Sequence, residues 1–180
     1  SIKSTVKGSL PNIYLFQGDI TDEEVYELYN HPKVKAMVSF TKGEGFGRPL
    51  LEFSLSNKPI ISSGWSGQLD FLDKDLAILV GGTLTDVHKS ALSQGTIIET
   101  SKWFTPDDGQ AANAIKNVYK NYKSFTVNAK KLGFKNRTNF SLDKMTEELG
   151  IILERTLPDF PKQIELNLPK LNLPKLQTNG

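Results

Sequence analysis

The chain has 180 residues, of which 38% are hydrophobic and 23% are charged, as in a folded domain with a core rather than a disordered chain. Its formal net charge of +2 is too small to indicate binding to nucleic acid or to an acidic membrane surface. Cysteine is absent, which excludes disulfide bonds and thiolate metal sites.

The N-terminal part of the sequence predicts a strand followed by a helix. Residues 12–16, NIYLF, form a short apolar run that is broken at Gly18, as expected for a strand. Thr21 and Glu24 form a capping box, in which each side chain can bind a free amide at a helix start. The sequence therefore predicts a helix that begins after Thr21 and ends near His31.

The middle of the chain alternates strands with a helix. A strand is expected over residues 34–40, followed by the glycine-rich turn TKGEGFG at 41–47. A helix is expected over 49–56, because Pro49 suits the first helical position, where its missing amide is not needed. Three further strands are expected, the last of them short and exposed, at 59–63, 76–80 and 96–100.

The C-terminal part is predicted to be helical from about Asp107, with a last helix over 141–155. That helix is expected to turn one apolar face inward, formed by Leu142, Met145, Leu149 and Ile152. Strands that alternate with helices predict an α/β fold with a Rossmann-like parallel sheet flanked by helices.

The last part of the chain differs in composition. The unit NLPKL occurs at 167–171 and again at 172–176, and its proline is unfavourable in a helix or a central strand. We therefore expect residues 158–180 to form an extended tail, with the binding of a partner as an alternative role.

The TKGEGFG turn is the strongest candidate for a binding site. Ligands of parallel sheets bind beyond the carboxyl ends of the strands, and glycines let the backbone approach a ligand closely. Free amides at a helix start suit a phosphate, while the carboxylates of Glu44 and Glu52 can accept hydrogen bonds from hydroxyl groups. A sugar nucleotide has this layout. The glycines do not match a dinucleotide fingerprint, and taken alone they favour a simple tight turn over a binding site.

A longer stretch of the sequence supports a sugar-nucleotide site rather than a simple turn. Residues 44–63, EGFGRPLLEFSLSNKPIISS, resemble the signature of the retaining GT-B glycosyltransferases of family 4 (group 1), E-G-F-G-x-P-x-x-E-A-x-x-x-G-x-P-V-I-x-S. Phe53 replaces the usual alanine and Asn57 the usual glycine, and asparagine tolerates the same left-handed helix exit. The resemblance extends over residues 11–155 and implies that 1–157 form part of the C-terminal, donor-binding lobe.

The resemblance implies a role for each residue of the site. Glu52 would hold the ribose hydroxyls and Glu44 the transferred sugar, and these two are the candidate catalytic residues. Asp19 and Ile20 would lie near the base. The backbone amides expected to face the sugar and the diphosphate are those of Gly45, Phe46, Gly47, Arg48, Leu50 and Leu51. No metal and no further cofactor are expected.

The resemblance also implies what else the reaction needs. Family members use a basic Arg and Lys pair from an earlier part of the same lobe, and a separate lobe that binds the acceptor. Lys3 and Lys7 are not identifiable as replacements for that pair. We therefore expect a chain that represents most of one half of a hexosyltransferase-like enzyme and is inactive alone. Its expected partners are a nucleotide sugar, a glycan, lipid or protein acceptor and the N-terminal lobe, but not nucleic acid.

Alternative functions remain open at the level of the sequence. A transferase-like lobe can serve as a non-catalytic binding or assembly module, and a sugar-nucleotide epimerase is a third class. Trp65 can stack on a base or a sugar or can pack internally, whereas packing is expected for Trp103. No apolar run approaches the roughly 20 residues of a membrane-spanning helix, so we expect a cytoplasmic protein, with peripheral membrane association as an alternative.

Overall fold

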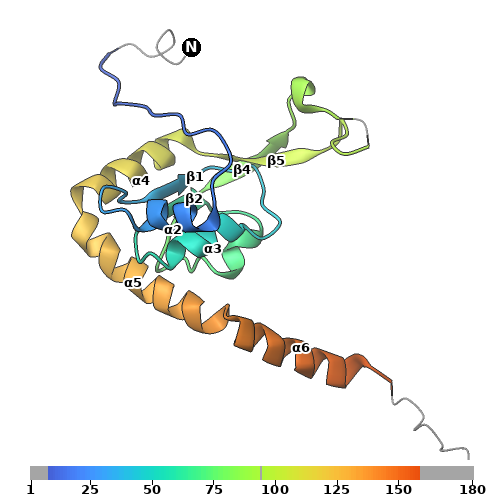
Figure 1. Cartoon of the computed structure of the whole chain (residues 1–180). Helices are drawn as coiled ribbons and strands as arrows, with labels where there is room; N and C mark the ends of the chain where they lie inside the picture. The colour runs from blue at the N-terminus through green and yellow to red at the C-terminus, as the bar shows by residue number, and fades with distance from the viewer. Residues whose placement is uncertain (1–7, 94, 159–180) are drawn as a thin grey trace, which may run out of the picture. The chain divides into compact units, whose positions relative to one another are not determined.

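The computed structural model describes residues 8–93 and 95–158 and confirms an α/β fold, with a small parallel sheet flanked by helices in a Rossmann-like arrangement (Figure 1). The sheet has the order β1-β2-β3, formed by β1 (Met37–Ser39), β2 (Ile60–Ser63) and β3 (Ile78–Val80). In its register, Met37 pairs with Ile60 and Ile61 with Ile78. The NLPKL repeats, Lys3 and Lys7 lie outside the described residues.

The core lies on both faces of the sheet, because β2 is covered on each side. Ile60 and Ile61 are consecutive, so their side chains point to opposite faces, and each is 1% exposed. Ile60 belongs to a cluster that includes residues of α3 (Arg48–Ser54) and α5 (Tyr122–Asn139). Ile61 packs with residues of α4 (Asp108–Lys120). All four residues of the central strand are buried as a result of this double coverage.

The capping box predicted at Thr21 is present at the start of α2 (Asp22–Asn30). The Thr21 amide donates to Glu24 Oε2 at 2.8 Å, and the Glu24 amide donates to Thr21 Oγ1 at 3.3 Å. At the other end, Lys58 Nζ donates to the carbonyl oxygens of Tyr29 and His31 at 2.6 and 2.8 Å. Lys58 thereby ties the last turn of α2 to the segment that leads into β2.

The predicted start of α3 is confirmed to within one residue, whereas the helix ends at Ser54, two residues before the predicted end. Gly47 precedes the helix with φ 87°, a left-handed conformation that favours glycine, and Pro49 lies in the first turn. After the helix, Asn57 has φ 60°, which is the left-handed exit expected at this position.

Two strand predictions were wrong. Residues 12–16 form no strand, and Ile13, Tyr14, Leu15 and Phe16 are 61–87% exposed. Their backbone pairs with no other strand among the described residues, and an apolar run without a partner strand forms no ladder. Residues 96–100 also form no strand, although Ile97 makes an isolated bridge with Ser93.

A β-hairpin begins at Gly82, shortly after β3. β4 (Gly82–Asp86) pairs antiparallel with β5 (Lys102–Pro106), and in Figure 1 the hairpin projects from the parallel sheet. The loop between the strands contains the short 3-10 helix η2 (Lys89–Ala91). Neither strand was predicted from the sequence, because β4, GTLTD, has only one large apolar residue and β5, KWFTP, ends in proline.

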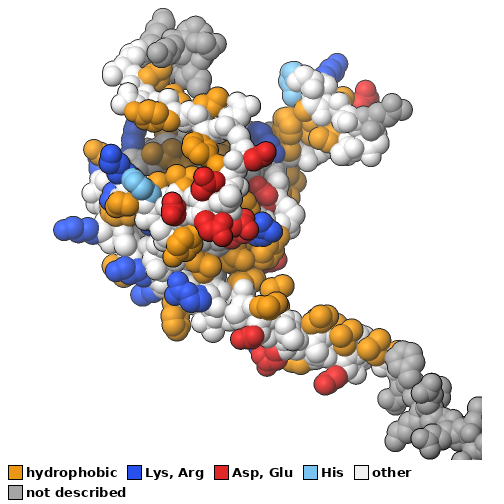
Figure 2. Space-filling view, in the orientation of Figure 1, with side chains coloured by type: hydrophobic (Ala, Val, Ile, Leu, Met, Phe, Trp, Pro, Cys, Tyr) orange, Lys and Arg blue, Asp and Glu red, His pale blue; other side chains and the backbone are white. Residues whose placement is uncertain are grey.

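The chain divides into two compact units, the second of which begins at Leu142. In that unit, α6 (Leu142–Thr156) has the predicted range to within one residue. Its predicted inward face is wrong, since Leu142, Met145, Leu149 and Ile152 are 79, 60, 55 and 51% exposed. Figure 2 shows hydrophobic side chains on the surface of the helix that Figure 1 labels α6. Within its own unit, α6 is the only helix or strand described, so the face has no neighbouring element there.

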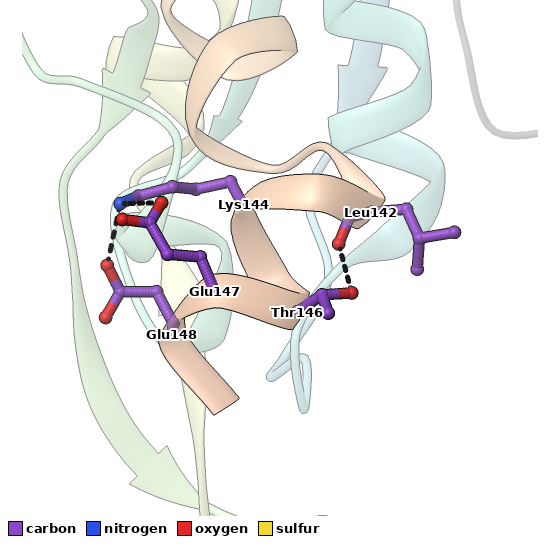
Figure 3. Close-up of polar contacts among 5 residues, drawn as sticks. All are labelled: Leu142, Lys144, Thr146, Glu147 and Glu148. Atoms are coloured by element: carbon purple, nitrogen blue, oxygen red, sulfur yellow. Dashed lines mark hydrogen bonds and ion pairs between the residues drawn. The ribbon is translucent and has the colours of Figure 1, made fainter. Parts of the chain in front are cut away.

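Side-chain pairs along α6 support the helix itself. Lys144 Nζ lies 3.0 Å from a carboxylate oxygen of Glu147 and 3.0 Å from one of Glu148 (Figure 3). The Thr146 hydroxyl donates to the carbonyl oxygen of Leu142 at 2.8 Å. The oppositely charged pairs at these spacings stabilise a helix without any tertiary contact.

Candidate functional site

The loops that follow the parallel strands meet at one edge of the sheet, because the carboxyl ends of parallel strands lie together. The loop after β1 is joined to β2 by the Ser63 hydroxyl, which donates to the carbonyl oxygen of Thr41 at 3.0 Å. The Gly64 amide, just after β2, donates to the carbonyl oxygen of Val80 at 2.8 Å. This edge is where a ligand of such a sheet is expected to bind.

Ser66 fixes the loop that carries Glu44. Its hydroxyl donates to the Glu44 carbonyl oxygen at 2.7 Å and accepts from the Glu44 amide at 3.2 Å. The Gly67 amide donates to the same carbonyl oxygen at 3.1 Å. Gly67 must be a glycine, because a Cβ there would overlap the carbonyl oxygen of Gly45. The backbone of Glu44 is therefore held from a loop 22 residues away in the sequence.

Some of the predicted backbone donors are available and others are not. The amides of Leu50 and Leu51 donate to the carbonyl oxygen of Gly47 at 2.9 and 3.3 Å, so they are used within the start of α3. Four amides donate no hydrogen bond to any other described residue, namely those of Gly45, Phe46, Gly47 and Arg48. These four form the stretch of backbone that can bind a ligand.

The side chains of this stretch have mostly structural roles. Leu50 is 2% exposed and lies in the core, with Leu51 packed against it. The Phe46 ring packs against those of Phe71 and Phe140, with centroids 5.2 and 6.0 Å apart. The Glu44 carboxylate differs from these apolar groups, since it accepts no hydrogen bond from another described residue and is half-buried. Among the side chains of residues 44–51, only those of Glu44 and Arg48 offer polar atoms to a ligand.

Glu52 lies in a cleft between α2 and α3 that has a volume of about 620 Å³. Arg48 Nε lies 2.8 Å from Glu52 Oε1, one helical turn away, and both side chains are substantially exposed. The other polar side chains of the lining are those of Asp22, Tyr26, Tyr29, Asn30, Ser56 and Arg137. Burial, and after it the negative charge of Glu52, raises the pKa of the Tyr29 hydroxyl. The cleft thus combines carboxylates, guanidinium groups and phenol rings.

The structure brings only part of the predicted site together. Arg48 and Glu52 share the cleft, but Glu44 does not line it and belongs to the edge loop. Ile20 lines a different hollow beside α2, together with Phe16, and Asp19 lines neither of the two. The residues expected near a base are thus not among those that surround Glu52.

Gln68 and Asp70 are two further polar residues in the segment that follows β2. Gln68 is fully buried, and its Nε2 donates to the carbonyl oxygen of Ser63 at 3.0 Å, so it supports the loop. Asp70 is exposed and ends the short 3-10 helix η1 (Gly67–Asp70). Neither residue lines the cleft that holds Glu52.

Aromatic residues border the loop on the side of the hairpin. The Trp65 ring is stacked on that of Phe104, with centroids 5.8 Å apart and planes at 3°. Lys42 Nζ lies 5.0 Å from the centroid of the Trp103 ring. Ser66 and Phe104 were not predicted as parts of the site, because their contacts with the loop are between segments distant in the sequence and leave no local pattern.

Among residues 8–93 and 95–158, no group of three or more histidine, aspartate or glutamate side chains is placed to hold a metal ion. No helix in this part of the chain is both long and apolar enough to cross a membrane. The chain matched no protein-family model, no curated protein and no solved structure.

Proposed function

We propose that this chain is the donor-binding lobe of a retaining glycosyltransferase. In this proposal, loop 44–48 binds the diphosphate of a nucleotide sugar, Glu52 binds the ribose hydroxyls and Glu44 contacts the transferred sugar. The single observation that carries the proposal is the row of amides at residues 45–48 that donate to no other described residue, in a loop fixed at the carboxyl edge of a parallel sheet.

The fixed loop suits the chemistry of sugar transfer. When a sugar departs, negative charge grows on the nucleoside diphosphate that is left behind. Donors that already point at this charge stabilise it without having to reorganise. Ser66 and Gly67 hold the backbone of Glu44 in place, and no atom lies within 4 Å of the position that a Cβ at Gly45 would occupy. The loop therefore has both rigidity and open space.

The pair of Arg48 and Glu52 can exchange partners at little cost. Exposed ion pairs one helical turn apart contribute only about 0.3–0.5 kcal/mol, and here the Arg48 and Glu52 side chains are 78 and 42% exposed. A ribose with two neighbouring hydroxyls can replace the guanidinium as the partner of the carboxylate. The released Arg48 then adds a positive charge beside the diphosphate, where the lobe needs one.

Donor binding is the property to test in this chain, because the acceptor site belongs to the other lobe in the proposed enzyme. The wild-type chain would be titrated by isothermal calorimetry with UDP, GDP and ADP and with their glucose or mannose conjugates. We expect one nucleoside diphosphate to bind. Loss of a hydrogen bond to a charged group should make Glu52→Gln bind it about ten- to a hundred-fold more weakly.

A second variant separates the role of Glu44 from that of Glu52, and a third serves as a control. Glu44→Gln should weaken binding of the sugar conjugate while leaving that of the free diphosphate unchanged. Glu23→Gln, an exposed change on α2 outside the cleft, serves as the control and should bind as the wild type does. The proposal is wrong if the wild type binds no nucleotide, or if the double variant of Glu44 and Glu52 binds as tightly as the wild type.

A further inference from the structure

We propose that Trp65 is a stacking platform for a pyranose ring, placed beside Glu44 so that the sugar contacts an aromatic face and a carboxylate together. This inference rests on the proposed function and extends it by naming the ligand of the hairpin side of the site. It assigns to Trp65 the recognition of the sugar rather than of the base.

Trp65 is an exposed ring that is nevertheless held in one orientation. It is 42% exposed, whereas Phe104, on which it stacks in parallel, is only 5% exposed. Phe104 covers one face of the indole, so the exposed area belongs to the rest of the ring system. A large aromatic side chain that is kept partly in water and supported from behind is suited to bind another ring.

The backbone is fixed on both sides of Trp65. Before it, the Gly64 amide donates to the carbonyl oxygen of Val80 at 2.8 Å. After it, Ser66 and Gly67 both donate to the carbonyl oxygen of Glu44, at 2.7 and 3.1 Å. Trp65 is thus the neighbour in sequence of Ser66, which binds the backbone of Glu44. Trp65 and Glu44 therefore belong to two loops that hydrogen bonds hold together.

The hairpin is tied to the same loop. The Phe104 amide on β5 donates to the carbonyl oxygen of Lys42 at 3.0 Å, and Lys42 Nζ lies 3.4 Å from Thr105 Oγ1. Phe104 supports Trp65 from this strand. Glu44, Trp65 and Phe104 therefore come from three segments that hydrogen bonds join at one edge of the sheet.

A pyranose ring matches this combination of groups. Its faces carry C–H bonds, which lose contact with water when they pack on an aromatic ring. Its rim carries hydroxyl groups, which can donate hydrogen bonds to a carboxylate, and the Glu44 carboxylate has no partner among the described residues. A nucleobase can also stack on tryptophan, but it has no face of C–H groups and no rim of hydroxyls.

The test compares each sugar conjugate with its free nucleoside diphosphate on the 180-residue chain. Trp65→Ala should bind the conjugate about five- to ten-fold more weakly than the wild type does, with unchanged affinity for the free diphosphate. Trp65→Phe, which keeps an aromatic face, should retain most of the affinity. If the Trp65→Ala variant does not fold, Trp65→Leu takes its place in the test, because leucine still covers Phe104 but has no aromatic face.

Fluorescence gives an independent signal. The sequence contains two tryptophans, so Trp103→Phe leaves Trp65 as the sole emitter. The conjugate should change this emission more than the free diphosphate does. Two outcomes would refute the platform in a wild type that binds a nucleotide. In the first, changes at Trp65 weaken binding of the conjugate and of the free diphosphate equally, as stacking of the base on Trp65 would require. In the second, these changes weaken binding of neither ligand. If the wild type binds no nucleotide at all, the proposed function itself fails and the inference falls with it.

Discussion

Asn136 on α5 donates a hydrogen bond of 2.9 Å from Nδ2 to the hydroxyl of Ser54 on α3, and each residue is only 1% exposed. The Ser54 hydroxyl in turn donates to the carbonyl oxygen of Leu51 at 2.6 Å. This polar link crosses an interface that is otherwise apolar, formed by residues such as Phe53 and Leu132. It fixes α3, the helix that carries Arg48 and Glu52, against the long helix α5.

Asn136→Ala should lower the free energy of unfolding by about 1–3 kcal/mol, because a buried hydroxyl loses its partner. Urea denaturation of the wild type and the variant measures this difference. Asn113→Ala, an exposed change on α4, should stay within about 0.5 kcal/mol of the wild type. Equal stability of the two variants would show that the link between α3 and α5 does not contribute.

Gly67→Ala should destabilise the fold and abolish donor binding, because its Cβ would overlap the backbone of Gly45 and push the two edge loops apart. Gly45→Ala is the matched change in the facing loop, where no atom lies within 4 Å of the added carbon. We expect its stability to stay within about 0.5 kcal/mol of that of the wild type. Thermal unfolding followed by circular dichroism compares the two.

Gly45→Ala should nevertheless weaken nucleotide binding in the proposed site, since the added methyl group occupies space beside the unpaired amides. The expected result is thus a stable protein that binds poorly. A stable Gly67→Ala variant would contradict the close contact between the loops. Full nucleotide affinity in Gly45→Ala would place the ligand away from this loop.

Sequence patterns predicted the features that short segments determine alone. The capping box at Thr21 and the left-handed exit at Asn57 depend on a few neighbouring residues, and both are present. The strand predicted over 12–16 and the inward face predicted for α6 depend on partners elsewhere in the fold, and both predictions were wrong. An apolar pattern indicates what can be buried, but tertiary contacts decide whether it is.

The candidate site shows the same division. The signature located the loop of Glu44 and the helix of Glu52, because loop and helix are continuous in the sequence. It could not show that Ser66 fixes the loop, since this contact spans 22 residues. Nor could it show that the amides of Leu50 and Leu51 donate to the carbonyl oxygen of Gly47. These hydrogen bonds depend on how the first turn of α3 closes.

Lys58→Met should loosen the wall of the cleft that α2 forms. The change removes the hydrogen bonds from Lys58 to the carbonyl oxygens of Tyr29 and His31 while keeping most of the apolar stem. We expect faster hydrogen exchange of the α2 amides, measured by mass spectrometry, and a loss of about 1–2 kcal/mol in stability. Lys33→Met, an exposed change nearby, should alter neither property. Unchanged exchange in Lys58→Met would show that α2 is held by its apolar face alone.

The ion pair between Asp73 and Lys135 should make stability depend on pH in acid. Lys135 Nζ lies 2.7 Å from Asp73 Oδ2, and this hydrogen bond, followed by one from the Asp75 amide, holds the pKa of Asp73 below its ordinary value of 3.8. The folded state therefore takes up this proton less readily than the unfolded state. The resulting stabilisation is complete above the ordinary pKa and is lost as the pH falls through the lowered one.

Asp73→Asn should accordingly be less stable than the wild type at about pH 6, and the difference should shrink as the pH falls below the ordinary pKa of aspartate. Urea midpoints measured across this range test the expectation. Lys135→Met removes the larger cause of the shift but leaves the Asp75 amide, so it should flatten the pH dependence only in part. Lys130→Met, an exposed change on the same helix, should follow the wild-type curve. A constant difference between Asp73→Asn and the wild type at every pH would show that the Asp73 carboxylate contributes through its packing rather than its charge.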